Sequence, residues 1–99
     1  MSQSHFAGKV ALVVGASRNM GRAFAEALAA DGAAVAIHYN SAGSRAGAEE
    51  AAAQIHAAGG QAFAVQADIT KTAEVRRLFD AVEARFGHLD ILINTAGMM

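Results

Sequence analysis

A glycine-bounded loop follows the first apolar run of this chain. The loop, residues 15–21, reads GASRNMG, and it lies between the run 10–14 and a stretch with helical periodicity. In such an arrangement the backbone turns tightly, and the free N–H groups at the positive end of the helix form an anion site that suits a pyrophosphate. The loop therefore predicts dinucleotide binding. The alternative is an ordinary strand-to-helix turn, because Ser17 stands where the strict Gly-x-Gly-x-x-Gly fingerprint has its second glycine.

The elements that must position this loop alternate between strand and helix. Apolar runs predict strands at 9–14, 34–39, 61–66 and 90–94, and helical periodicity predicts helices at 20–31, after the turn 40–44 to about 58, and up to 86. Gly32 and Gly87 stand where helices commonly end in a left-handed residue. Strands and helices at this spacing indicate right-handed βαβ units, and thus a Rossmann-type doubly wound parallel sheet of the α/β class with strand order 3-2-1-4.

Composition excludes several classes of protein. The 99 residues allow one small domain, 54% are hydrophobic, and neither proline nor cysteine occurs, so a disulfide framework and a thiolate metal site are ruled out. The net charge of −1 with scattered Lys and Arg speaks against nucleic-acid binding. Neither a signal peptide nor a membrane-crossing run is recognisable, so we expect a cytoplasmic protein.

The strand predicted at 90–94 reads as fully buried. A buried parallel strand needs cover on both faces and partners at both edges, and no remaining element of the sequence could supply them. We therefore expect residues 1–99 to be the N-terminal part of a single, longer dinucleotide-binding domain.

Three motifs carry a family resemblance. The loop 14–21 is similar to Thr-Gly-x-x-x-Gly-x-Gly, except that Val14 replaces the threonine and Asn19 the middle glycine; Asp68-Ile69 follows the third strand, and residues 94–97 read Asn-Thr-Ala-Gly. In order and spacing, residues 1–97 resemble the N-terminal half of the classical short-chain dehydrogenase/reductase family. The closest likeness is to the branch that contains the 3-oxoacyl carrier-protein reductases. Asparagine tolerates left-handed backbone better than most residues, so the turn can survive Asn19.

The resemblance implies a cofactor-binding role for fourteen residues. The pyrophosphate would be lined by Gly15, Ser17, Met20 and Gly21, with Asn19 in the same loop. The 2′-phosphate would meet Arg18, Asn40 and Ser41, with Tyr39 at the end of the second strand beside them. Adenine would be held by Asp68 and Ile69, and the nicotinamide side would be bordered by Asn94, Ala96 and Gly97. For Asp68 the alternative is a local Asx turn or helix cap. For Tyr39 and Arg18 the alternatives are a strand-forming residue and a solvated loop cation.

The end of the second strand distinguishes the two nicotinamide cofactors. NAD sites usually carry Asp or Glu there, about 20 residues past the loop, to hold the ribose 2′-hydroxyl. Tyr39 occupies that place in this chain and is followed by Asn40 and Ser41. A carboxylate at this place would repel a 2′-phosphate, and none is present. Arg18 could supply a positive charge that binds the phosphate through two parallel hydrogen bonds. The sequence therefore favours NADP over NAD.

The resemblance implies an oxidoreductase that transfers a hydride between NADP(H) and a small carbonyl or alcohol substrate, as a homo-oligomer, tetrameric or dimeric. The family's proton donor is a tyrosine followed four residues later by a lysine. The one tyrosine here is Tyr39, with Gly43 four residues on, so the sequence offers no catalytic residue. A non-catalytic nucleotide-binding module, or a fragment that needs another chain, is the alternative; a methyltransferase is weaker, because the loop lacks Gly-x-Gly. Four histidines without ligand spacing predict no metal site.

Arg18→Ala should weaken NADPH binding more than NADH binding in the complete protein, because the countercharge to the 2′-phosphate is lost. Fluorescence titration of both nucleotides measures the two affinities. Equal losses would contradict the assignment of Arg18 to the 2′-phosphate.

Overall fold

The computed structural model describes residues 6–15 and 19–94 of the chain. Strands and helices alternate throughout, with one short 3-10 turn, η1. In chain order they are β1 (Val10–Val14), α1 (Asn19–Ala30), β2 (Ala34–Tyr39), η1 (Ala42–Ser44), α2 (Arg45–Ala57), β3 (Gln61–Gln66), α3 (Thr72–Phe86) and β4 (Ile91–Asn94). The bounds of β2 and β3 coincide with those expected from the sequence, and the other elements begin or end within a residue or so of them.

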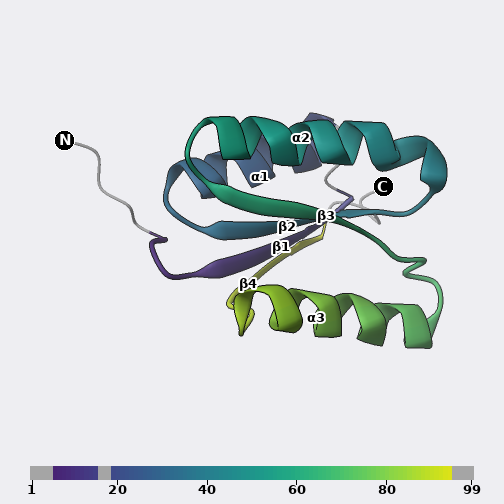
Figure 1. Ribbon diagram of the computed structural model, residues 1–99. Helices are drawn as coiled ribbons and strands as arrows, with labels where there is room; N and C mark the ends of the chain where they lie inside the picture. The colour runs from purple at the N-terminus through teal and green to yellow at the C-terminus, as the bar shows by residue number, and fades with distance from the viewer. Residues whose placement is uncertain (1–5, 16–18, 95–99) are drawn as a thin grey trace.

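The four strands form one parallel sheet in the order β3-β2-β1-β4. Helices α1 and α2 cover one face of the sheet, and α3 covers the other (Figure 1). This is the predicted strand order and the predicted Rossmann-type fold. It follows from right-handed crossovers, which place successive helices on one face until the chain returns past β1 and changes direction.

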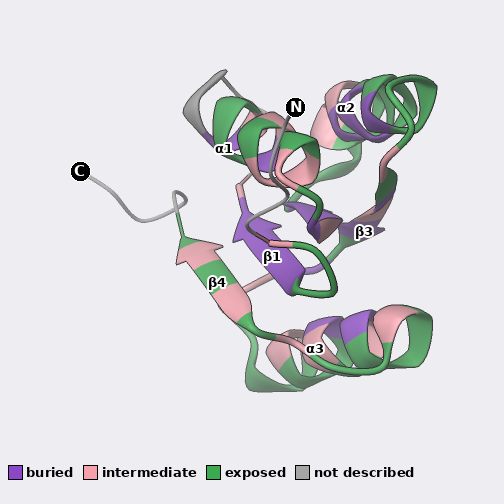
Figure 2. Cartoon of the chain, turned by 90° about the vertical axis from the view of Figure 1, so that its left-hand side faces the viewer, coloured by how far each residue is buried: buried purple, intermediate pink, exposed green. Residues whose placement is uncertain are grey.

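Each face of the sheet has its own hydrophobic core. Val13 and Ile37 face α1 and α2, where the alanines of α2 permit close packing. Leu12 and Ala36 face α3 and meet Leu78. Because helices cover both sides of β1, all five of its residues are buried, which explains why this strand is a continuous apolar run (Figure 2).

Strand β4 differs from the prediction. It was expected to be fully buried, but its residues alternate between half-buried and exposed, and Leu92 is 54% exposed. The physical reason is its place at the edge of the described sheet, where its pairing partner is β1 (Figure 2). The apolar composition of β4 was read correctly, but the cover it would need is not found within residues 6–15 and 19–94.

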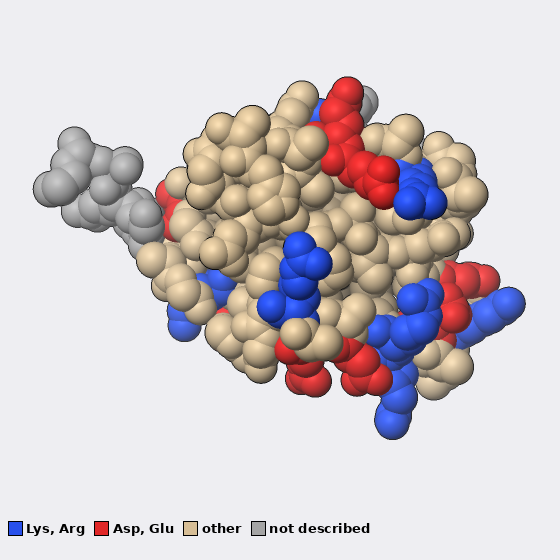
Figure 3. All heavy atoms as spheres, viewed as in Figure 1, with Lys and Arg blue, Asp and Glu red and all other residues tan. Residues whose placement is uncertain are grey.

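Charge is mixed on the surface. On the face shown in Figure 3, Lys and Arg lie beside Asp and Glu and do not form an all-basic stripe. Arg22 of α1, for example, pairs with Glu50 of α2 at 2.9 Å and so joins the two helices. Within the part of the chain that the structure describes, none of the helices is long and apolar enough to cross a membrane.

Expressed alone, residues 1–99 should self-associate, because the exposed Leu92 of β4, the outer strand of the described sheet, offers apolar surface. Light scattering after size-exclusion chromatography measures this. Leu92→Lys should reduce the association, whereas Ala84→Lys, which adds the same charge on an exposed part of α3, should not. A monomeric wild-type segment that melts cooperatively would contradict the prediction.

Candidate nucleotide-binding site

The glycine turn begins directly at the end of β1. Gly15 has a φ of +80°, a left-handed conformation in which a side chain would be strained, and α1 starts four residues later at Asn19. Gly21 is buried in the first turns of α1. A buried strand, a left-handed glycine and a helix start thus follow one another as a phosphate-binding turn requires. Ser17 and Arg18 lie outside the described residues, and their roles stay predictions.

Asn19 needs no tolerance of left-handed geometry. It is the first residue of α1, and no described residue other than glycine has a positive φ. The helix starts one residue earlier than expected, so Asn19 is helical and adopts no left-handed backbone. Asn19 and Met20 lie at the N-terminus of α1, where backbone N–H groups lack intrahelical partners.

A buried histidine lies next to the glycine turn. His38 of β2 is 1% exposed; its Nδ1 accepts a hydrogen bond from the N–H of Gly15 (3.1 Å), and its Nε2 lies 2.8 Å from the carbonyl oxygen of Ala67. A carbonyl only accepts, so Nε2 carries the proton and Nδ1 is the bare acceptor. Burial lowers the pKa of His38, against the weaker opposing effect of the bond to Ala67, and keeps the ring neutral.

The sequence predicted only that His38 points to one face of the sheet. The structure places it on the face covered by α3, which it shares with Ala36 by strand alternation. The sequence does contain a sign of this role. A polar side chain one residue before the end of an otherwise apolar, buried strand needs hydrogen-bond partners. The identity of those partners depends on two other strands, which the sequence alone does not specify.

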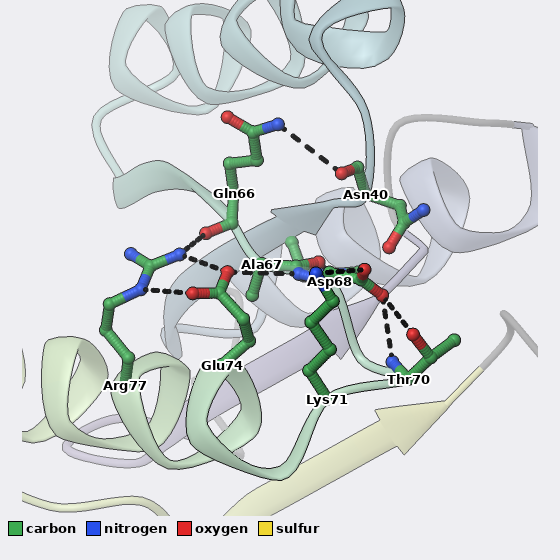
Figure 4. A network of polar contacts seen from close by, with 9 residues as sticks. Asn40, Gln66, Ala67, Asp68, Thr70, Lys71, Glu74 and Arg77 are labelled. Atoms are coloured by element: carbon green, nitrogen blue, oxygen red, sulfur yellow. Dashed lines mark hydrogen bonds and ion pairs between the residues drawn. The ribbon is translucent and has the colours of Figure 1, made fainter.

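Asp68 holds the loop that leaves β3 (Figure 4). Its Oδ1 accepts hydrogen bonds from the N–H (3.0 Å) and the hydroxyl (2.6 Å) of Thr70, and its Oδ2 lies 3.9 Å from Nζ of Lys71. The bonds from Thr70, and then the charge of Lys71, lower the pKa of Asp68. This is the Asx turn that the sequence left open as the alternative. It leaves Oδ2 as the oxygen that could accept from an adenine amino group, so the two roles are compatible.

A second polar group fixes the same loop to α3. Glu74 accepts a hydrogen bond from the N–H of Asp68 (3.3 Å), and Arg77 binds both Glu74 (2.8 Å) and the carbonyl oxygen of Gln66 (2.7 Å), as Figure 4 shows. The hydrogen bond from Arg77 is the main cause that lowers the pKa of Glu74. Sequence reasoning missed this clamp, although Glu and Arg three residues apart at a helix start are a recognisable pair.

The end of β2 carries no carboxylate. Asn40 and Ser41 are exposed, and the carbonyl oxygen of Asn40 accepts a bond from Gln66 (3.4 Å). Tyr39 is 7% exposed and packs in the core beneath α1 and α2, so the alternative reading of Tyr39 as a strand-forming residue accounts for its position. Arg45, the first residue of α2, pairs with Glu49 at 3.0 Å.

The parallel sheet brings the described candidates to one edge. Val14 is level with Asn94, and Tyr39 is level with Gln66. Gly15, Asn40 and Ala67, the first residues after β1, β2 and β3, therefore lie at the same edge of the sheet as the end of β4. Ile69 lies half-buried in the loop after β3 and packs against the core under α3. Ala96 and Gly97 lie outside the described residues. The edge formed by the carboxyl ends of parallel strands is where ligands bind in open α/β sheets.

A cavity of about 660 Å³ lies at the opposite edge. It is lined by the carboxyl ends of α1 and α2 and the amino ends of β2 and β3, including Ala30, Ala34, Ala58 and Gln61. Carboxyl ends of helices carry partial negative charge, which disfavours a phosphate. The cavity is therefore not the predicted nucleotide site.

The other described histidines bind nearby backbone or side-chain oxygens. His56 lies 2.7 Å from the carbonyl oxygen of Ala62, and His88 lies 2.9 Å from Oδ2 of Asp90. Over residues 6–15 and 19–94, no three His, Cys, Asp or Glu side chains are grouped as metal ligands would be.

Residues 9–99 match the family described as short chain dehydrogenase. The chain belongs to this family. An uncharacterised oxidoreductase of Methylorubrum extorquens is 50% identical over 95 residues, and a 3-oxoacyl-[acyl-carrier-protein] reductase of Staphylococcus epidermidis is 44% identical over 90 residues. These alignments cover 96% and 91% of this chain but only 38% and 36% of the two relatives.

A solved dehydrogenase shares the fold closely. The crystal structure of a putative dehydrogenase from Burkholderia cenocepacia with bound NADP superposes with a TM-score of 0.87 at 50% identity, over 95% of this chain and 36% of that one. The chain thus spans a little over a third of the length of the relatives and the solved structure it matches. The family resemblance read from the sequence is confirmed.

Gly15→Ala should weaken nucleotide binding, because an alanine at φ +80° costs about 1–2 kcal/mol and shifts the turn. Gly8→Ala is the matched control: Gly8 has a φ of +81°, and an added Cβ there meets nothing within 4 Å. Thermal melting should show a similar loss of stability for both variants, and nucleotide titration should show a loss for Gly15→Ala alone. Equal affinities would contradict the placement of the site.

Proposed function

We propose that this chain forms the NADP(H)-binding half of an oxidoreductase that transfers a hydride between NADP(H) and a carbonyl or alcohol substrate. The observation that carries the proposal is the left-handed Gly15 between buried β1 and the start of α1, at the same edge of the sheet as Asp68. Family membership supports the reaction class, since the relatives include an oxidoreductase and a ketoacyl-type reductase.

The donor set fits a dinucleotide. N–H groups at the start of α1 suit the pyrophosphate, Oδ2 of Asp68 can accept from the adenine amino group, and Asn94 ends β4 on the predicted nicotinamide side. The Asx turn and the Glu74–Arg77 clamp hold the adenine-side loop before any ligand arrives. Such preorganisation lowers the ordering cost of binding.

Preference for NADP rests on the exit of β2. Asn40 and Ser41 are exposed there and uncharged, so a 2′-phosphate would meet no like charge. Two solved relatives from Burkholderia cenocepacia, 50% and 48% identical to this chain, contain NADP. Arg18 is our proposed countercharge.

When bound, the nicotinamide supplies the hydride chemistry, and a separate acid must protonate the developing alkoxide. The only tyrosine of the sequence, Tyr39, is buried in the core at the predicted adenosine end, so it is not that acid. We assign no catalytic residue among residues 1–99. We propose that the acid is the tyrosine of the family's Tyr-x-x-x-Lys pair, outside residues 1–99. We further propose a cytoplasmic homo-oligomer, tetrameric or dimeric, by analogy with the family.

A second candidate is a non-catalytic nucleotide-binding module that works with another chain; the lack of a Tyr-x-x-x-Lys pair in residues 1–99 supports it. The two proposals differ in turnover. The protein encoded by the complete gene should consume NADPH with a panel of ketones and β-ketothioesters if it is the enzyme. Nucleotide binding without turnover would favour the module, and absence of any nucleotide binding would overturn both.

Ser41→Asp should reverse the cofactor preference. Ser41 is exposed and makes no side-chain cap hydrogen bond, so we expect the position to tolerate substitution. The carboxylate of the introduced aspartate would repel the 2′-phosphate of NADPH and accept a hydrogen bond from the ribose hydroxyl of NADH. We expect NADPH affinity to fall about tenfold or more, the effect of one unfavourable charge contact of ~1.4 kcal/mol, while NADH affinity is kept or improved.

Ala53→Asp is the control for the charge change itself. It adds the same charge on an exposed position of α2, roughly 12 Å from the start of that helix at 1.5 Å per residue. Titration of both nucleotides should leave its preference unchanged. Similar results for Ser41→Asp and Ala53→Asp would contradict the placement of the 2′-phosphate beside Ser41.

A further inference from the structure

The imidazole of His38 bridges the ends of two strands that flank its own. Its two ring nitrogens bind the N–H of Gly15, one residue past β1, and the carbonyl oxygen of Ala67, one residue past β3. Strand β2 lies between these two strands in the sheet. One rigid five-membered ring therefore sets the separation between the starts of two loops.

The backbone does not make this connection at Gly15. The paired residues of β1 and β2 end at Val13 and Ile37, so Gly15 lies beyond the β1–β2 ladder. On the other side the ladder continues further, because the N–H of Ala67 donates to the carbonyl oxygen of Tyr39 at 3.1 Å. The side chain of His38 thus extends the sheet where the chain bends into the glycine turn.

Both anchored peptides lead directly into the proposed nucleotide site. The bond to Gly15 orients the peptide that begins the left-handed turn, and the bond to Ala67 orients the carbonyl just before Asp68. If the site binds as proposed, the first loop meets the pyrophosphate and the second meets adenine. A fixed separation between the loops then matches a fixed separation between two parts of one ligand.

His38 has no free group for another role. It is 1% exposed, both ring nitrogens have partners, and the two distances of 3.1 and 2.8 Å are ordinary hydrogen bonds. A protonated ring would place a second N–H against the N–H of Gly15, so the bridge requires the neutral ring. The group neither binds a ligand directly nor acts as an acid.

On the basis of the proposed function, we propose that His38 is a positioning residue for NADP(H): through Gly15 it fixes the phosphate-binding turn, and through Ala67 it holds that turn in register with the adenine loop. The bond to Gly15 is the one that carries nucleotide affinity, because the left-handed turn has no ladder partner in β2.

Two substitutions separate the two bonds. In His38→Asn, the side-chain oxygen occupies the place of Nδ1 and can still accept from Gly15, while the bond to Ala67 is lost. In His38→Gln, the amide nitrogen occupies the place of Nε2 and can still donate to Ala67, while the bond to Gly15 is lost. Each variant gives up one buried hydrogen bond, so thermal melting should show similar losses of stability.

Affinity for NADP⁺ distinguishes positioning from plain structural support. In the complete protein, we expect His38→Gln to bind NADP⁺ about tenfold more weakly than wild type, as for one lost hydrogen bond, and His38→Asn to bind within about twofold of it. NMR of the ring nitrogens should show the neutral Nε2–H tautomer in wild type. Equal affinities in the two variants, or the opposite tautomer, would overturn the inference.

The experiment also separates this inference from the proposed function. If wild type and both variants all fail to bind NADP⁺, the proposed function is wrong and the positioning role falls with it. If wild type binds and the two variants lose affinity in parallel with their melting temperatures, the function stands and the inference about His38 is wrong.

Discussion

Burial of β1 and β2 on both faces is the constraint from which the rest of the structure follows. With helices above and below, neither strand can carry a polar side chain along its length without a partner, so polar chemistry is confined to the strand ends. His38 is a buried polar residue that meets this condition, since it lies one residue from the end of β2 and both its ring nitrogens are hydrogen-bonded. The same constraint collects Gly15, Asn40 and Asp68 at one edge.

Much of this fold is predictable from local patterns. Strands β2 and β3 begin and end as expected because glycines or polar turns bound their apolar runs. The strand order follows from the handedness of the crossovers. The glycine turn and the Asp68 loop are recognisable because their function depends on residues close together in sequence. The exposure of Leu92 was not predictable, since the apolar sequence of a strand does not determine whether other elements cover it.

The unpredicted polar contacts join separate elements of the fold. His38 contacts residues 23 positions before it and 29 after it, and the Glu74–Arg77 clamp reaches back to the end of β3. These contacts can be identified only when the alignment of the neighbouring strands is known. Asn19 shows the reverse case: a family departure that looked like a cost in the turn becomes an ordinary helical residue once the helix is found to begin there.

The parallel orientation of the three helices gives the molecule a net dipole. In each βαβ unit the helix runs opposite to the strands, so every amino terminus lies near the edge with Gly15 and every carboxyl terminus lies near the edge with the large cavity. Each macrodipole amounts to about half an elementary charge at either end, and the three add. These partial positive charges favour an anion at the first edge, in addition to the charge of Lys71 at the start of α3. At physiological salt, screening limits the attraction to roughly 8 Å.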